Sequence, residues 1–263
     1  HVFALLEHAR NDLLARFPEK EPRERIENWF SDQTNRVSNL VEEEDTGRLV
    51  DLYKKWVEAE TNDAVDVRYT SELFHITADR VEEEPGFYLL RQFIVDYDRM
   101  AELHNRAIEA VDTGVKPLDM CAGELPFFLV RRWDGRQTRT SLYLVGDKLC
   151  SGEGQEWNLG HNKTIPAAEM QAAGVKAIAG KALVLVLQAR CMGKGGGTLC
   201  LPYKGSQYMN ATHEFEANLR EAGLLPESIP PVMRVRFNTF EHWRHCSTII
   251  RLPPYLKGTF SSD

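Results

Sequence analysis

The chain of 263 residues is 43% hydrophobic and 27% charged, a composition typical of globular proteins that bury a core without disulfides or metals. Its 32 Lys and Arg against 39 Asp and Glu give a formal net charge of −7, which argues against a protein built mainly to hold the nucleic-acid backbone. No apolar run reaches the roughly 18 residues of a membrane-spanning helix, so we expect no membrane span.

The five cysteines are sparse, odd in number and free of any Cys-x-x-Cys pair. A secreted disulfide framework has a denser and even set, so we expect reduced thiols that mostly act as small buried apolar groups. The first residues place Glu7, His8 and Arg10 among apolar positions, unlike the uninterrupted apolar run of a signal peptide. We therefore expect a cytoplasmic protein.

The first part of the chain predicts helices. Residues 1–115 hold only three of the 18 glycines and are rich in Leu, Glu, Arg, Asp and Ala. Apolar residues recur there at spacings of three and four, as on one face of a helix. This spacing predicts helices over residues 2–17, 23–43, 49–56 and 86–111, with a break in the second helix at Ser31 and Asp32.

Residues 116–263 hold the other glycines and nine of the 12 prolines, and they alternate strand-like with helix-like runs. An Asp-Gly pair between two β-rich runs predicts a hairpin over 125–145. The run Ala-Leu-Val-Leu-Val-Leu fits a buried strand or a buried helix, and its valines favour a strand. The predicted order is a helix over 167–173, strands over 181–188 and 198–201, a helix over 207–222 and a strand over 232–237.

This order of elements predicts a mixed α/β fold. A helical N-terminal portion, residues 1–115, precedes a Rossmann-like α/β unit with a β-hairpin, residues 116–263. The two portions form either separate domains or one continuous domain.

The first candidate site is the glycine-rich segment 191–198, which contains Lys194, Gly195 and Gly196. Glycine lets backbone N–H groups converge on an anion, and the lysine adds positive charge. The segment has neither P-loop nor dinucleotide-binding spacing, so a plain connector is the alternative.

The second candidate site lies at the start of the helix predicted over 207–222. Ser206 fits the N-cap position, and a helix N-terminus beside Lys204 favours a carboxylate or a phosphate. An ordinary capped helix is the alternative. The residues assigned to this second candidate are Tyr203, Lys204, Gly205, Ser206, Tyr208 and His213.

Two further clusters carry less weight. His242, His245 and Cys246 resemble a fragment of a metal site but lack the remaining ligands at a suitable spacing, so we expect no metal. Arginines around Trp133 in the predicted hairpin form a basic and aromatic face of the kind that binds single strands. The net charge argues against nucleic acid as a partner, and no cofactor is indicated.

A resemblance to a known family rests on segments that cover about half of the chain. In chain order they are FIVDYDRMAELHNRAIEA, GELPFFLVRRWDGR, KALVLVLQAR, LPYKGSQYMNATHEFEANL and PPVMRVRF. This series is similar to bacillithiol synthase-like proteins and uncharacterised bacterial relatives, with Gln188, Tyr208 and residues 204–206 as the matching positions. Residues 203–206 replace the Gly-Gly-Pro-Gly turn of that family. The resemblance implies a ligase-type reaction that joins an amino acid to a glycoside.

Two classes of function follow. The first is a protein that binds a small anionic or sugar-like metabolite, either as a ligase or transferase or as a degenerate relative of one. The second is a non-catalytic interaction or assembly protein whose helical face, with Trp29, Phe30, Tyr53 and Trp56, packs on a partner unless these aromatics fill the core. An exposed apolar patch would favour the second class, and a polar pocket beside Lys204 the first.

Overall fold

The computed structural model describes residues 2–17, 19–43, 49–62, 67–133, 136–192, 199–202, 208–225 and 229–235. The chain divides into two compact units, with the described part of the first ending at Arg68 and the second spanning Tyr69–Phe237. The composition change near residue 115 falls inside the second unit, where it precedes the first strand of the sheet.

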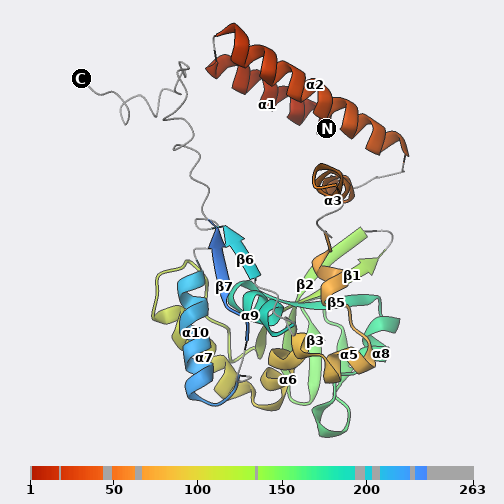
Figure 1. Ribbon diagram of the computed structural model, residues 1–263. Coiled ribbons are helices and arrows are strands. Elements are labelled where there is room, and N and C mark those ends of the chain that lie inside the picture. The colour runs from red at the N-terminus through yellow and green to blue at the C-terminus, as the bar shows by residue number, and fades with distance from the viewer. Residues whose placement is uncertain are drawn as a thin grey trace, which may run out of the picture. The chain divides into compact units, whose positions relative to one another are not determined.

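The first unit is helical in its described part (Figure 1). It contains α1 (Val2–Arg16), α2 (Lys20–Glu43) and α3 (Leu49–Glu60), which confirms the three helices predicted there. The break expected at Ser31 and Asp32 is wrong, because both residues lie on the exposed side of a continuous α2, where a polar side chain stays solvated. Both α1 and α3 pack against α2.

The second unit is built on a five-stranded antiparallel sheet. Its strands are β1 (Glu124–Trp133), β2 (Arg136–Val145), β3 (Lys148–Ser151), β4 (Glu156–Asn158) and β5 (Val175–Gly180), in the order β4-β3-β2-β1-β5. β1 and β2 form the predicted hairpin, with Trp133 opposite Arg136 in the register. The Asp134-Gly135 pair that predicted the turn lies outside the described residues.

Helices of the second unit pack on this sheet and on one another (Figure 1). They are α4 (Thr70–Leu73), α5 (Ala78–Glu83), the 3-10 turn η1 (Pro85–Phe87), α6 (Tyr88–Val95), α7 (Tyr97–Glu109), the 3-10 turn η2 (His161–Lys163), α8 (Ala167–Ala172), α9 (Ala182–Met192) and α10 (Met209–Glu221). One buried apolar cluster joins helices and sheet, with Phe93, Phe127 and Phe215 in ring contact at its centre.

The long helix predicted over 86–111 is instead divided between η1, α6 and α7. Asp96 leaves the helical region, with φ −136° and ψ 69°, and thereby separates α6 from α7. The Lys163 ammonium donates hydrogen bonds to the carbonyl oxygens of Ile94 (3.2 Å) and Val95 (3.1 Å) at the end of α6. This partner comes from a distant part of the chain, so helical periodicity alone could not predict the break.

The strand predicted over 181–188 is wrong, because this run forms α9. Apolar side chains lie around almost the whole circumference of the helix, including the half-buried Ala182, Leu185 and Ala189, so the sequence shows neither a helical nor a strand period. The strand at this place is β5, immediately before it. Gln188, fully buried in α9, ties the two elements by accepting from the Gly180 N–H (2.7 Å) and donating to the Ile178 carbonyl (3.2 Å).

A smaller parallel pair of strands contains the second predicted site region. β6 (Leu199–Pro202) and β7 (Val232–Val235) are parallel, and α10 lies between them in the chain. The predicted strand, helix and strand are therefore confirmed as a βαβ arrangement. The main sheet is antiparallel, however, so the described strands do not establish a Rossmann-like unit.

Two expectations about composition have mixed outcomes. In the described part of the chain, none of the helices is long and apolar enough to cross a membrane. Cys121, Cys150 and Cys191 are free thiols, but only Cys191 is buried, and burial raises its pKa to about 11. Cys121 is exposed, so the expectation of mostly buried cysteines is wrong for this residue.

Candidate functional site

Most of the predicted ligand residues lie outside the described part of the chain. These are Lys194, Gly195, Gly196, Tyr203, Lys204, Gly205 and Ser206. Their two segments directly precede and follow β6 in the sequence.

Tyr208 and His213 are the two predicted ligand residues that the structure describes. Tyr208 is half-buried immediately before α10, and its carbonyl accepts hydrogen bonds from the backbone and the hydroxyl of Thr212 (2.9 and 3.1 Å). His213 is exposed. Five helical positions correspond to about 140° around the axis, so the two side chains leave the start of α10 in different directions.

An ion pair fixes α10 beside α9 and the start of β7. The Arg190 guanidinium binds the Glu216 carboxylate at 2.5 Å and donates from Nε to the Pro230 carbonyl at 2.6 Å. Burial alone would raise the pKa of Glu216, but hydrogen bonds from Arg190 and Arg220 outweigh it, so the pKa is lowered. The carboxylate therefore stays ionised and holds α10 in place, and this network serves the fold.

A second polar cluster lies where β1 meets the start of α9. The Lys181 ammonium binds Glu124 at 2.8 Å and the Ser141 hydroxyl at 3.2 Å, and it lies 5.0 Å from the centre of the Phe128 ring. Tyr97 donates its hydroxyl to the Glu124 carbonyl at 3.1 Å, and burial together with the Glu124 charge raises its pKa to about 12. Each of these polar side chains is engaged by the others, as expected of a structural cluster.

One arginine of the basic face predicted around Trp133 is not on the surface. Arg131 is buried, with 7% of its surface exposed, and it donates to the Glu153 carboxylate (2.7 Å) and the Ala173 carbonyl (3.0 Å). Its charge is therefore used inside the second unit. Arg132 and Arg139 remain exposed on the hairpin.

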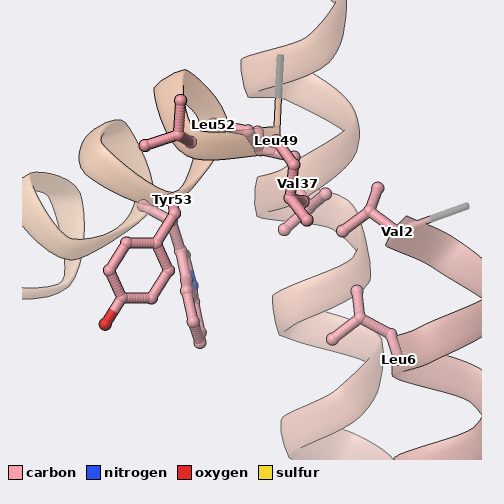
Figure 2. Close-up of a pocket in the computed structure, with 8 residues that line it drawn as sticks. Val2, Leu6, Val37, Leu49, Leu52 and Tyr53 are labelled. Carbon is pink, nitrogen blue, oxygen red and sulfur yellow. The ribbon is translucent and has the colours of Figure 1, made fainter. Parts of the chain in front are cut away.

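A groove in the first unit is lined by side chains from all three of its described helices. Its volume is about 480 Å³, and every residue that lines it is aliphatic or aromatic. Figure 2 shows side chains from three helices facing the same hollow. The lining residues are Val2 and Leu6 from α1, Val37 from α2, and Leu49, Val50, Leu52, Tyr53 and Trp56 from α3.

The groove is open, because several of its lining side chains are solvent-exposed. Leu49 is 61% exposed, Tyr53 58% and Val50 49%, whereas Val37 and Leu52 are buried and form the floor. Trp56 is held in place by a hydrogen bond from its Nε1 to the buried Gln33 side chain at 2.7 Å. Exposed apolar residues gathered in a hollow are typical of binding surfaces.

Four aromatic residues were candidates for a partner surface or for the core, and the structure divides them. Phe30 is buried and packs edge-on against Trp29 at 4.8 Å, so it belongs to the core of the helical unit. Trp29 is 49% exposed but does not line the groove. Tyr53 and Trp56 line the groove, where they lie edge-on to each other at 6.2 Å.

Sequence reasoning missed the groove as a site. The helical spacing marked Val2, Leu6, Val37 and Leu49 as apolar-face residues, and such residues ordinarily pack inside a domain. A usable signal was present in α1, where Val2, Phe3, Leu5 and Leu6 follow almost without interruption and exceed one helix face.

Comparisons of the chain with protein-family models, with curated proteins and with solved structures found no match. The resemblance to bacillithiol synthase-like proteins therefore rests on the sequence segments alone. In the described residues, no group of three or more His, Cys, Asp and Glu side chains is arranged to hold a metal ion. His242, His245 and Cys246 lie outside that part of the chain.

Proposed function

We propose that this mixed α/β protein is a non-catalytic interaction protein that binds an apolar segment in the groove of its helical unit. The observation that carries the proposal is the 480 Å³ hollow lined only by aliphatic and aromatic residues. Its volume lies within the range of about 300–1,000 Å³ that is usual for binding pockets. A groove of this kind accepts the apolar face of a helix or an extended apolar segment.

The exposed residues of α3 are the expected energetic centre of this surface. Leu49, Val50 and Tyr53 remain largely in water. A partner that covers them therefore gains the free energy of burying apolar surface that the fold leaves exposed. Full burial of one such side chain contributes about 1.5–3 kcal/mol. Interfaces typically concentrate their binding energy on a few residues of this kind.

The test is a matched pair of substitutions, Leu49→Asp and Leu5→Asp. Both leucines lie in the first turn of a helix and are almost equally exposed, at 61% and 60%, but only Leu49 lines the groove. Proteins captured by the wild-type chain and by Leu5→Asp, but lost from Leu49→Asp, are the expected result. Equal capture by both variants would refute a role for the groove.

A second candidate function is binding of a small anionic or sugar-like metabolite after β6. It is favoured by the parallel β6–α10–β7 arrangement, because ligands of such units bind beyond the carboxyl ends of the strands. Lys204 and Ser206 occupy this stretch of the sequence. A ligase or transferase activity belongs to this candidate through the resemblance alone.

A thermal-shift screen tests this second candidate with anionic metabolites, sugar conjugates and nucleotides. A ligand at 100 times its dissociation constant stabilises the protein by about 2.7 kcal/mol. The expected hit is lost in Lys204→Ala and Ser206→Ala. A hit that both variants retain would place the ligand elsewhere in the molecule.

A further inference from the structure

The chain itself contains a segment whose apolar and aromatic side chains match the apolar lining of the groove. Residues 236–263 are 28 residues outside the described part of the structure, and nine of them are large apolar or aromatic side chains. They are Phe237, Phe240, Trp243, Ile249, Ile250, Leu252, Tyr255, Leu256 and Phe260. A segment so rich in such residues is costly to leave in water.

Charge also favours this pairing. Residues 1–68 carry ten Lys and Arg against sixteen Asp and Glu, a net charge of −6. Residues 236–263 carry four Lys and Arg against two Asp and Glu, a net charge of +2, together with two histidines. Residues 1–68 thus account for most of the net charge of −7 of the chain, whereas the segment is basic. Opposite net charges favour their association over distances of about 8 Å at physiological salt.

The segment is long enough to cover the groove. Twenty-eight residues span up to about 90 Å when extended, whereas the twelve residues of α3 are only about 18 Å long. Because the segment and the helices belong to one chain, their association is intramolecular and needs no second molecule. An affinity that would be weak between separate molecules is then enough to keep the groove covered.

We propose that residues 236–263 bind in the apolar groove of α1, α2 and α3 and compete there with an external partner. This inference rests on the proposed function, because it takes the groove as the binding surface. Aromatic and aliphatic side chains of the segment cover Leu49, Val50 and Tyr53, and its basic residues face the acidic helical unit.

The test uses the full chain with a photo-crosslinking residue, p-benzoylphenylalanine, in place of Tyr53 or Trp29. Both aromatic side chains are about half exposed, at 58% and 49%, so neither change removes core packing, and only position 53 lines the groove. Far-UV circular dichroism checks that both variants keep their helices. Mass spectrometry maps the cross-linked peptides at two protein concentrations that differ tenfold.

Cross-links from position 53 to residues 236–263 of the same chain, unchanged on dilution, are the expected result, and position 29 serves as the negative control. Adding Leu49→Asp, which places a carboxylate among the apolar residues that line the groove, is expected to reduce them. Leu5→Asp is the matched control that leaves them unchanged. Absence of cross-links between position 53 and the segment overturns the proposal.

Two further outcomes separate this proposal from the one on which it rests. Cross-links from position 53 to a second copy that fade on dilution overturn the intramolecular occupant in favour of a dimer. If position 53 does not reach the segment but Leu49→Asp still abolishes partner capture, the occupant is wrong and the interaction surface stands. If Leu49→Asp changes neither cross-linking nor capture, both proposals fail.

Discussion

His104 makes the stability of the second unit depend on pH in a predictable direction. The imidazole is 3% exposed on α7 and lies edge-on to the rings of Phe93 (6.5 Å) and Phe215 (5.3 Å), with Nδ1 3.2 Å from the Asn105 side-chain oxygen. Burial lowers its pKa from 6.5 to about 4, although the contact with Asn105 acts in the opposite direction. The folded state therefore holds the neutral ring through most of the range in which the unfolded chain binds a proton.

The size of the effect follows from proton linkage. Because the folded pKa lies below the unfolded one, the stabilisation is complete above pH 6.5 and is lost as the pH falls toward 4. The loss is about 2 kcal/mol at pH 5 and approaches about 3 kcal/mol below pH 4, at 1.36 kcal/mol per pKa unit.

Urea unfolding of the wild type and of His104→Leu between pH 7.5 and 4.5 measures this loss. Hydrogen exchange of β1 peptides serves as the probe of the second unit. Carboxylates titrate equally in both proteins, so the difference between the two pH profiles isolates His104. We expect the variant to lose about 2 kcal/mol less than the wild type between pH 7.5 and 5. Parallel profiles would show that the ring is protonated without cost, and would refute the reasoning.

Two packing predictions concern the tight junction between β5 and α9. A methyl group added at Gly180 would lie 2.5 Å from a backbone nitrogen of α9, so Gly180→Ala should cost about 3 kcal/mol or more. Gly223→Ala is the control, since φ is +68° with open space around it, and its cost should stay near 1 kcal/mol. Gln188→Leu removes both hydrogen bonds to β5 and should cost about 3 kcal/mol, because two buried backbone groups lose their partners. Urea unfolding measures all three, and a cost below 1 kcal/mol for Gly180→Ala or Gln188→Leu would contradict the geometry.

Helices with one apolar face were predictable from the sequence, whereas the run that became α9 was not. In α3, Leu49, Leu52 and Trp56 repeat at spacings of three and four, so the pattern alone indicated a helix. In α9, apolar side chains lie around almost the whole circumference of the helix, so the sequence pattern has no period. The choice of a helix is made by tertiary contacts, among them the buried amide of Gln188 that returns to β5.

The candidate sites show a similar limit. Glycine and lysine spacing pointed to residues 194–196 and 203–206, which the structure does not describe, and placed with them Tyr208, which is half-buried, and His213, which is exposed. The groove arises only when Val2, Val37 and Leu49, far apart in sequence, come together on three helices. Each residue alone looks like ordinary core, and only its exposure in the folded unit shows that the core is incomplete.

An open groove also links binding to the stability of the helical unit. The described part of this unit buries few apolar side chains completely, with Leu14, Phe30, Val37 and Leu52 as its main core residues. A tethered occupant whose effective concentration exceeds its intrinsic dissociation constant 100-fold would stabilise these helices by about 2.7 kcal/mol. The second unit has its own continuous core and would gain nothing from the same event. Removing the occupant should therefore lower the stability of α1, α2 and α3 selectively, which makes hydrogen exchange in α3 a direct measure of whether the groove is filled.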